Sequence, residues 1–230
     1  MLLGDLYLLS MDRIVVQRSG PLAGEVQVPG AKNSVLKLMV ASLYSAGTHE
    51  LTNVPAISDV KTMGKLLESL GLTVEHGIGE SGVLRLTNSG TIATVAPPEL
   101  VTSIRASINL LGPLLACRGR VRLDMPGGDD FGSRPIDMHV AGLTAMGVRF
   151  DINDNALSAE VDHLIGAHIT LDFPSVGATE NLLTAAVHAD GTTTISNAAR
   201  EPEVADLCDL LVEMGAKITG IGSSCLTIEG

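Results

Sequence analysis

Basic side chains are few in this sequence, and two of them stand in glycine-rich loops. The chain has 15 Lys and Arg against 26 Asp and Glu, yet Lys32 and Arg134 both lie in loops of this kind. The loops cover residues 29–33, 126–135 and 175–179, each ahead of an expected helix. Free amide N–H groups and the positive end of a helix attract anions, and glycine lets the backbone approach them closely. The loops therefore predict sites for phosphate or carboxylate, although any one of them alone is more often a plain strand-to-helix turn.

A third cation, Arg105, falls on an expected helix from Pro98 to Leu115, on a side apart from its apolar stripe. An arginine in such a place is more often a solvated or salt-bridged surface residue than a ligand. We consider Arg105 a possible anion ligand because cations are scarce in this chain and two others, Lys32 and Arg134, lie in the glycine-rich loops.

Three other patterns carry less weight. Residues 77–82 spell a dinucleotide-binding GxGxxG motif, but the strand-like segment 83–86 follows where a helix is required, so we predict a hairpin turn. Asp137 and His139 share one helix start without a further His or Cys at ligand spacing, so no metal site is predicted. The basic run in residues 118–122 alternates along a strand and predicts its solvated face.

Composition excludes several classes of protein. Hydrophobic residues make up 45% of the 230 and the mean hydropathy is +0.33, which is too apolar for a disordered chain. The net charge of −11 and the aromatic content of 2% leave no basic stripe or stacking surface for nucleic acid. Cys117, Cys208 and Cys225 are odd in number and far apart, so we expect a reducing compartment, the cytoplasm. The apolar segment of residues 1–9 is short and contains Asp5, so neither a signal peptide nor a membrane span is predicted.

An internal repeat organises the chain. Gly47, Gly119 and Gly191 follow expected helices and recur at intervals of 72 residues. The same order of elements surrounds each glycine: a strand and a helix before it, then a strand, a second helix and two strands. Val26 and Val28 alternate as strand residues do and predict the opening strand of the first repeat. We therefore expect an α/β fold of three βαβαββ repeats, which pack about a common axis with some helices inside because none can bury its apolar face alone.

These repeats form one expected domain, residues 24–230. Its repeats cover about 24–90, 91–163 and 164–230, and it follows an N-terminal extension of residues 1–10 and a strand within residues 11–23.

Several short motifs fall in the same order and at similar separations as in one known family. From about Met11 to Gly230 the sequence resembles the UDP-N-acetylglucosamine enolpyruvyltransferases. The motifs are residues 30–33 (GAKN), 105–108 (RASI), 111–114 (LGPL), 126–128 (PGG), 132–139 (GSRPIDMH), 175–179 (SVGAT) and 199–203 (AREPE). Together they are highly specific, whereas GAKN alone would be only suggestive.

The resemblance implies an inside-out α/β barrel fold, in which two similar domains hold the substrates between them; this chain resembles the first. It implies transfer of the enolpyruvyl group of phosphoenolpyruvate to the 3′-hydroxyl of UDP-N-acetylglucosamine, with release of phosphate. This is the first committed step of peptidoglycan precursor synthesis, and it needs no cofactor. In the family the strand near residues 14–17 pairs with the second domain. We therefore expect a separate second-half domain or self-association as partner, and neither nucleic acid nor membrane.

Residue roles follow from the resemblance as well. Lys32, Asn33, Arg105 and Arg134 would bind phosphoenolpyruvate, whose phosphate and carboxylate suit cations and bidentate arginines. The UDP-sugar would contact both arginines and the residues Pro135, Ile136, Asp137, Met138, His139, Ser175, Val176 and Gly177.

The sequence departs from the commoner family pattern at two positions. Asp129 stands where a Cys is usual, a variant known in the family, and is the expected proton donor to the methylene carbon of phosphoenolpyruvate. Because an unperturbed Asp has a pKa of about 3.9, this role needs a raised pKa, which burial beside Asp130 would favour and Arg134 would oppose. Ser58 stands where many members carry a Lys.

Two alternatives to an enzyme acting on UDP-N-acetylglucosamine stay open. Without the second domain the site is open to water, so we expect little or no turnover by the chain alone. The chain would then be a non-catalytic module that binds a nucleotide sugar, or an enolpyruvyltransferase acting on another uridine nucleotide. The GAKN and RPIDMH motifs argue against shikimate 3-phosphate.

Overall fold

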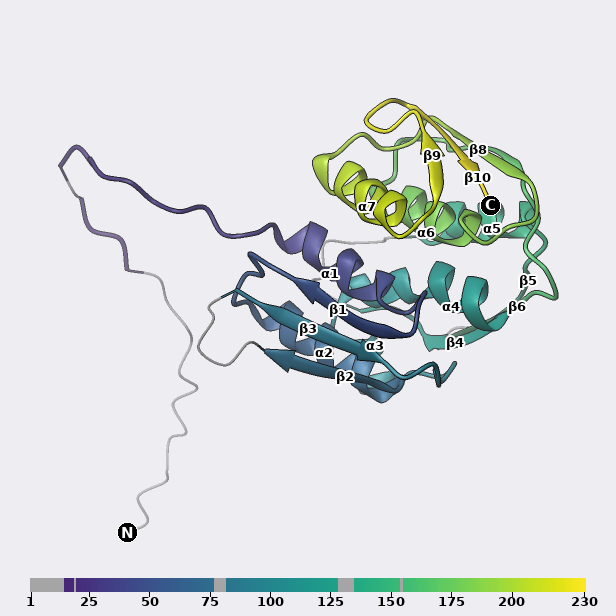
Figure 1. Ribbon diagram of the computed structural model, residues 1–230, viewed down its shortest axis with the longest axis horizontal. Coiled ribbons are helices and arrows are strands. Elements are labelled where there is room, and N and C mark those ends of the chain that lie inside the picture. The colour runs from purple at the N-terminus through teal and green to yellow at the C-terminus, as the bar shows by residue number, and fades with distance from the viewer. Residues whose placement is uncertain (1–14, 19, 77–81, 128–134, 154) are drawn as a thin grey trace, which may run out of the picture.

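The computed structural model describes residues 15–18, 20–76, 82–127, 135–153 and 155–230, and shows three successive units of helices and sheet (Figure 1). The first unit opens with helix α1, whose apolar face is buried. Its strands form an antiparallel sheet in the order β1-β3-β2. The elements are α1 (Lys32–Ala41), β1 (Gly47–Leu51), α2 (Ser58–Ser69), β2 (Leu72–His76) and β3 (Leu84–Asn88).

The second unit has an antiparallel sheet in the order β4-β6-β5. Its first helical segment is broken into three pieces. The elements are α3 (Pro98–Val101), the 3-10 helix η1 (Arg105–Leu110), α4 (Leu111–Arg118), β4 (Arg120–Asp124), α5 (Asp137–Ala145), β5 (Arg149–Ile152) and β6 (Ala156–Glu160).

The third unit has four strands in the order β7-β8-β10-β9, with β7 parallel to β8 and the other pairs antiparallel. The elements are β7 (His168–Thr170), α6 (Val176–Ala186), β8 (Thr192–Ser196), α7 (Pro202–Glu213), β9 (Lys217–Thr219) and β10 (Cys225–Glu229).

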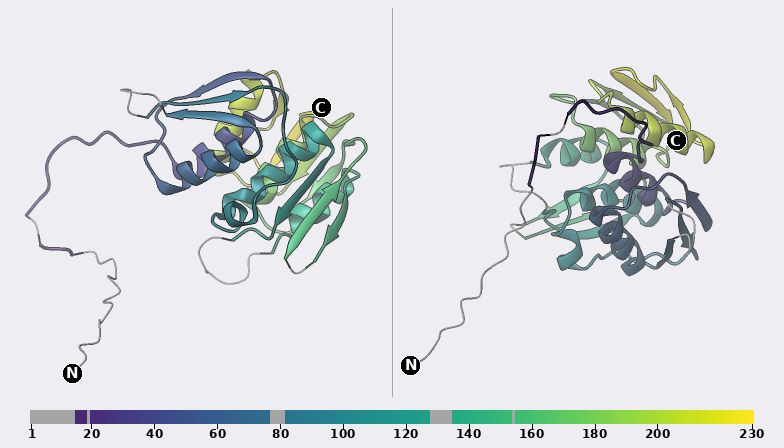
Figure 2. Two further views of the ribbon diagram at one scale, coloured as in Figure 1. Left: turned by 90° about the horizontal axis from the view of Figure 1, so that it is seen from below. Right: turned by 90° about the vertical axis from the view of Figure 1, so that its left-hand side faces the viewer.

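Helices occupy the inside of the molecule and the sheets lie outside them (Figures 1 and 2). Helix α6 is the clearest case, because every residue from 178 to 186 is buried. It packs against α4, α5 and η1, while α1 packs against α7 and η1. A helix buried on all sides has no solvent face on which to place polar groups. The predicted α/β arrangement of three repeats with helices inside is therefore present.

The glycines that revealed the repeat have the backbone that the prediction requires. Gly47, Gly119 and Gly191 have φ of +127°, +66° and +99°, a region that a side chain strongly disfavours. The GxGxxG segment lies outside the described residues except for Gly82, but the strand expected after it is present as β3, which pairs antiparallel with β2. Among the described residues no helix is both long and apolar enough to cross a membrane.

The prediction of an opening strand at Val26 and Val28 is wrong. Both side chains are exposed, and residues 20–31 contain no strand. In the third unit the equivalent strand, β7, pairs in parallel with β8, whereas in the first unit this segment runs away from the edge strand β1 (Figure 1). Alternation shows which residues suit a strand, but a strand also needs a partner for its backbone groups.

The prediction of one helix from Pro98 to Leu115 is also wrong. Ile104 has extended backbone angles (φ −139°, ψ 138°), which separate α3 from η1. The hydroxyl of Ser107 donates to the carbonyl oxygens of Val101 and Ile104, at 2.8 and 2.7 Å, and so bridges the ends of the two helical segments on either side of the break. Apolar spacing continued across the break, so the pattern alone could not reveal it.

Close packing of α4 on α6 gives a test of this fold. A Cβ at Gly112 would overlap Thr184 Oγ1 and the carbonyl oxygen of Asn181, both on α6. We expect Gly112→Ala to lower the free energy of unfolding by about 1–3 kcal/mol, measured by urea denaturation. Gly64→Ala on α2 is the matched control, because its Cβ would meet only Val74 at 3.4 Å. Equal effects of the two substitutions would contradict the packing described.

Candidate functional site

A cavity of about 670 Å³ lies where the ends of several helices meet. It is lined from all three units, by α1, α2, η1, α5 and α6. Of the predicted site residues it contains Lys32, Asn33, Arg105, Pro135, Met138, His139, Ser175, Val176 and Gly177. The fold thus brings together residues that are up to 145 positions apart in the sequence.

The first turn of α1 supplies Lys32 and Asn33. The backbone enters this helix through Gly30, where a Cβ would overlap the carbonyl oxygen of Asn53, and the Gly30 N–H donates to that oxygen at 3.1 Å. Lys32 Nζ lies 2.7 Å from Asp59 Oδ2 and remains half exposed. Asn33 Nδ2 donates to Glu203 Oε1 at 3.3 Å. Both side chains therefore reach the cavity while held by carboxylates from α2 and α7.

Arg105 begins η1, directly after the break in the helical segment. Its Nη1 donates to the carbonyl oxygen of Pro126 at 3.3 Å, and the residue is half-buried. The break at Ile104 matters here, because it starts a new helical segment at Arg105 at the rim of the cavity.

The start of α5 contributes unevenly. Met138 and His139 are buried against the cavity and Pro135 lies exposed at its rim. Ile136 is buried and does not line the cavity, whereas Asp137 lines a neighbouring cavity of about 280 Å³ on the far side of Met138. Asp129 and Arg134, the predicted proton donor and second arginine, lie outside the described residues.

The start of α6 forms the opposite wall. Ser175 is its N-cap, and the Ser175 hydroxyl oxygen accepts from the Ala178 N–H at 3.3 Å. A Cβ on Gly177 would lie 3.4 Å from the His139 ring, an ordinary van der Waals distance, so the imidazole packs directly against the first turn of α6. Val176 and Gly177 of this first helical turn line a cavity that also holds Arg105, an arrangement suited to anions.

Beneath the cavity, Asn181 joins the second and third units through a buried hydrogen-bond network. Its Nδ2 lies 3.3 Å from Asn109 Oδ1 and 3.1 Å from His139 Nδ1, and its Oδ1 accepts from the Gly112 N–H at 2.9 Å. Since Asn181 donates to Nδ1, the imidazole is neutral with its proton on Nε2. Burial, with a smaller effect of Arg105, lowers the pKa of His139 to about 4.

Sequence reasoning missed two charged residues of this cavity, Lys37 on α1 and Glu180 on α6. Lys37 Nζ lies 3.2 Å from Glu180 Oε1, and the two side chains are 10% and 1% exposed. The 72-residue repeat could have pointed to Lys37. Lys37 stands 72 residues before Asn109, which stands 72 before Asn181, so the three central helices place polar residues at equivalent positions.

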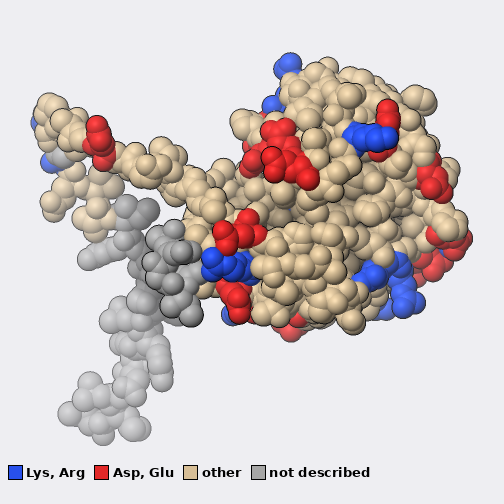
Figure 3. Space-filling model, viewed as in Figure 1, with Lys and Arg blue, Asp and Glu red and all other residues tan. Residues whose placement is uncertain are grey.

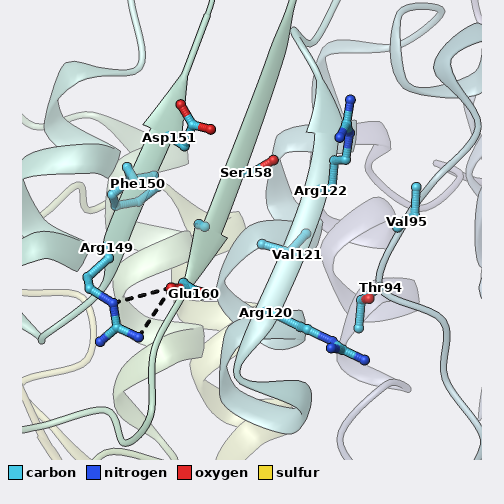
Figure 4. A pocket seen from close by; sticks show the side chains of 11 residues that line it. Thr94, Val95, Arg120, Val121, Arg122, Arg149, Phe150, Asp151, Ser158 and Glu160 are labelled. Atoms are coloured by element: carbon cyan, nitrogen blue, oxygen red, sulfur yellow. Dashed lines mark hydrogen bonds and ion pairs between the residues drawn. The ribbon is translucent and has the colours of Figure 1, made fainter.

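A second cavity, of about 630 Å³, lies on the outer face of the β4-β6-β5 sheet and contains none of the predicted site residues (Figure 4). Arg120 and Arg122 are exposed there while Val121 is buried, which confirms the solvated face predicted for this strand. Arg149 pairs with Glu160 in the same cavity. Arg118 differs from the prediction, because it ends α4 and donates to the Gly90 carbonyl at 2.6 Å.

Comparison with known proteins agrees with the fold and the site. The profile of the EPSP synthase (3-phosphoshikimate 1-carboxyvinyltransferase) family matches residues 16–230. This chain belongs to that family. Among curated members, it is 52% identical over 219 residues to UDP-N-acetylglucosamine 1-carboxyvinyltransferase of Corynebacterium jeikeium, and 49% identical over 222 residues to the protein of that name from Nocardia farcinica. Each alignment covers 95% of this chain and 52% of the relative, so the chain spans about half the length of these EPSP synthase family members.

Solved structures of the family show the same fold. The enolpyruvyl transferase NikO from Streptomyces tendae aligns with a TM-score of 0.78 at 22% identity, covering 90% of this chain and 48% of that one. EPSP synthase from Acinetobacter baumannii aligns with a TM-score of 0.71 at 19% identity, covering 90% and 47%. The inside-out α/β fold class and the family resemblance inferred from the sequence motifs are both confirmed.

The neutral state of His139 gives a test of the polar network. Its pKa falls from 6.5 to about 4 on folding, so its contribution to stability is present above pH 6.5 and is lost as pH falls toward 4. Between pH 7 and pH 5, wild type should lose about 2 kcal/mol of unfolding free energy relative to His139→Gln, which does not titrate. Urea denaturation of both proteins at the two pH values measures this. Parallel pH dependence in the two proteins would contradict a buried neutral imidazole.

Proposed function

We propose that this chain carries the first-domain half of the active site of an enzyme that transfers enolpyruvyl from phosphoenolpyruvate to the 3′-hydroxyl of UDP-N-acetylglucosamine. The observation that carries the proposal is the convergence of Lys32, Asn33 and Arg105 with the start of α6 in one cavity, in a chain about 50% identical to proteins named for this reaction. The reaction releases phosphate and commits precursors to peptidoglycan, and so bears on cell shape and division. Free thiols at Cys117, Cys208 and Cys225 support a cytoplasmic location.

The two ligands divide the cavity between them. Lys32, Arg105 and Arg134 face the phosphate and carboxylate of phosphoenolpyruvate, and Asn33 orients it. The Lys32–Asp59 pair holds the ammonium at the cavity until the ligand replaces the carboxylate; because Lys32 is more than half exposed, this exchange costs little.

The UDP-sugar lies along the start of α5 and the first turn of α6. Arg105, Arg134, Pro135, Met138 and His139 contact it from one side, and Ser175, Val176 and Gly177 line the other. The neutral His139 ring, with Nδ1 already occupied by Asn181, can offer only its Nε2 proton, so His139 acts as a hydrogen-bond donor and not as a base.

Bond making follows an addition and an elimination. The sugar 3′-hydroxyl gives its proton to a base of the second domain, and its oxygen adds to C2 of phosphoenolpyruvate while another proton goes to the methylene carbon. Loss of a proton from that carbon, together with phosphate from C2, then restores the double bond. Asp129 supplies the proton to the methylene carbon in this proposal. A second domain must close over the cavity to exclude water from the reacting groups. A separate second-half domain or a second copy of the chain is the partner we propose.

Binding of UDP-N-acetylglucosamine tests the site directly. We expect Arg105→Ala to weaken binding roughly 10- to 100-fold, since a charged hydrogen-bonding group contributes about 1.5–3 kcal/mol. Arg149→Ala, on the outer sheet, is the matched control and should bind as wild type does. Titration calorimetry measures the three affinities. Equal affinities, or no binding by wild type at millimolar ligand, would contradict the proposal.

A further inference from the structure

Lys37 and Glu180 form a buried ion pair in the floor of the candidate site that the reaction outlined above does not use. Lys37 lies one turn after Asn33 on the same face of α1, and Glu180 lies in the second turn of α6. Lys37 Nζ contacts Glu180 Oε1 at 3.2 Å. Glu180 Oε2 is buried and has no hydrogen-bond partner among the described residues. A carboxylate held by one cation and otherwise unsatisfied is an unstable arrangement in a buried place.

The surroundings of Glu180 are more negative than positive. Glu203 in the first turn of α7 and Glu201 just before that helix both add negative potential at Glu180, and acidic side chains gather over this helix (Figure 3). The thiol of Cys208, also on α7, is protonated because burial raises its pKa to about 12. His139 on α5 is neutral. Lys37 on α1 is therefore the cation that opposes these effects.

Glu180 is consequently poised between its two protonation states near neutral pH. Burial raises the pKa of its carboxyl to about 7, with Glu203 and Glu201 adding to the rise and Lys37 opposing it. When Glu180 is ionised, it neutralises Lys37. When Glu180 is protonated, the Lys37 charge is uncompensated and faces the same cavity as Arg105.

An anion in this cavity shifts the balance toward the protonated state. It adds negative charge near Glu180, which disfavours the carboxylate, and it offers the Lys37 ammonium another partner. By linkage, the protonated state of Glu180 must then bind the anion more tightly than the ionised state does.

We propose that Lys37 and Glu180 are positioning residues of the anion site: when a phosphate-bearing ligand enters, Glu180 takes one proton from solvent and Lys37 turns from the carboxylate to the ligand. The net charge of the cavity residues thereby rises by one when the negatively charged ligand binds. This inference deepens the proposed function, because it assigns these residues to the binding of its anionic substrates.

The sign of the pH dependence follows from the two states. Affinity for an anion of fixed charge is constant below pH 7, where Glu180 is already protonated, and falls as pH rises above 7, by at most about tenfold per pH unit. Glu180→Gln mimics the protonated state without titrating. At pH 8.5 this variant should bind the anion about tenfold more tightly than wild type, and at pH 6 equally well.

Calorimetry with two probes tests the inference on the full chain. UDP-N-acetylglucosamine and inorganic sulfate both keep a fixed charge between pH 6 and 8.5. Titrations at pH 7.5 in two buffers of different ionisation enthalpy count the protons taken up on binding. We expect uptake of a fraction of one proton by wild type and none by Glu180→Gln or Lys37→Met. Glu213→Gln and Lys65→Met, exposed on α7 and α2, are the matched controls and should behave as wild type.

The outcomes separate this inference from the proposed function. Sulfate binding with proton uptake that Glu180→Gln abolishes supports the inference even if the UDP-sugar fails to bind, which would overturn only the function. UDP-sugar binding without proton uptake overturns the inference and leaves the function standing. Failure of both probes to bind wild type overturns both. A merely structural pair could change affinity on substitution but would not change the proton count.

Discussion

The structure depends on satisfying polar groups where three central helices meet. Helices buried on all sides cannot send their polar residues to solvent, so Asn109, Asn181 and His139 must bond to one another. An unsatisfied group in such a place costs about 1–3 kcal/mol. Asn181 meets this constraint by binding residues from two helical segments and the Gly112 amide at once. The packing of α4 on α6, and so of the second unit on the third, follows from this network.

The same constraint builds the site. Because α1, η1, α5 and α6 begin near one another, residues at their starts surround one cavity. The polar floor fixes the His139 ring and its tautomer from below, while Lys32, Asn33 and Arg105 stay accessible above it. Residues that hold the fold thus lie directly beneath those that line the cavity, and Lys37 and Glu180, although buried, also line it.

Much of this was predictable from the sequence, for identifiable reasons. A backbone position with positive φ favours glycine, and each repeat has one after its first helix, so the equal spacing of Gly47, Gly119 and Gly191 revealed the repeat without tertiary information. Val26 could not be placed, because a strand depends on a partner that no local pattern specifies. Nor could the pairing of Lys37 with Glu180, since it joins helices 143 residues apart and sequence charge alone does not show burial.

The central claim, that this chain supplies one half of an enolpyruvyl-transfer site, is tested most directly by phosphate release. The measurement uses phosphoenolpyruvate and UDP-N-acetylglucosamine with the chain alone, and with the complementary half of the Corynebacterium jeikeium relative added as a separate polypeptide. We predict little or no release by either polypeptide alone and sustained release by the mixture, abolished by Asp129→Ala. No release by a mixture that still binds the UDP-sugar would contradict the account and identify the chain as a binding module.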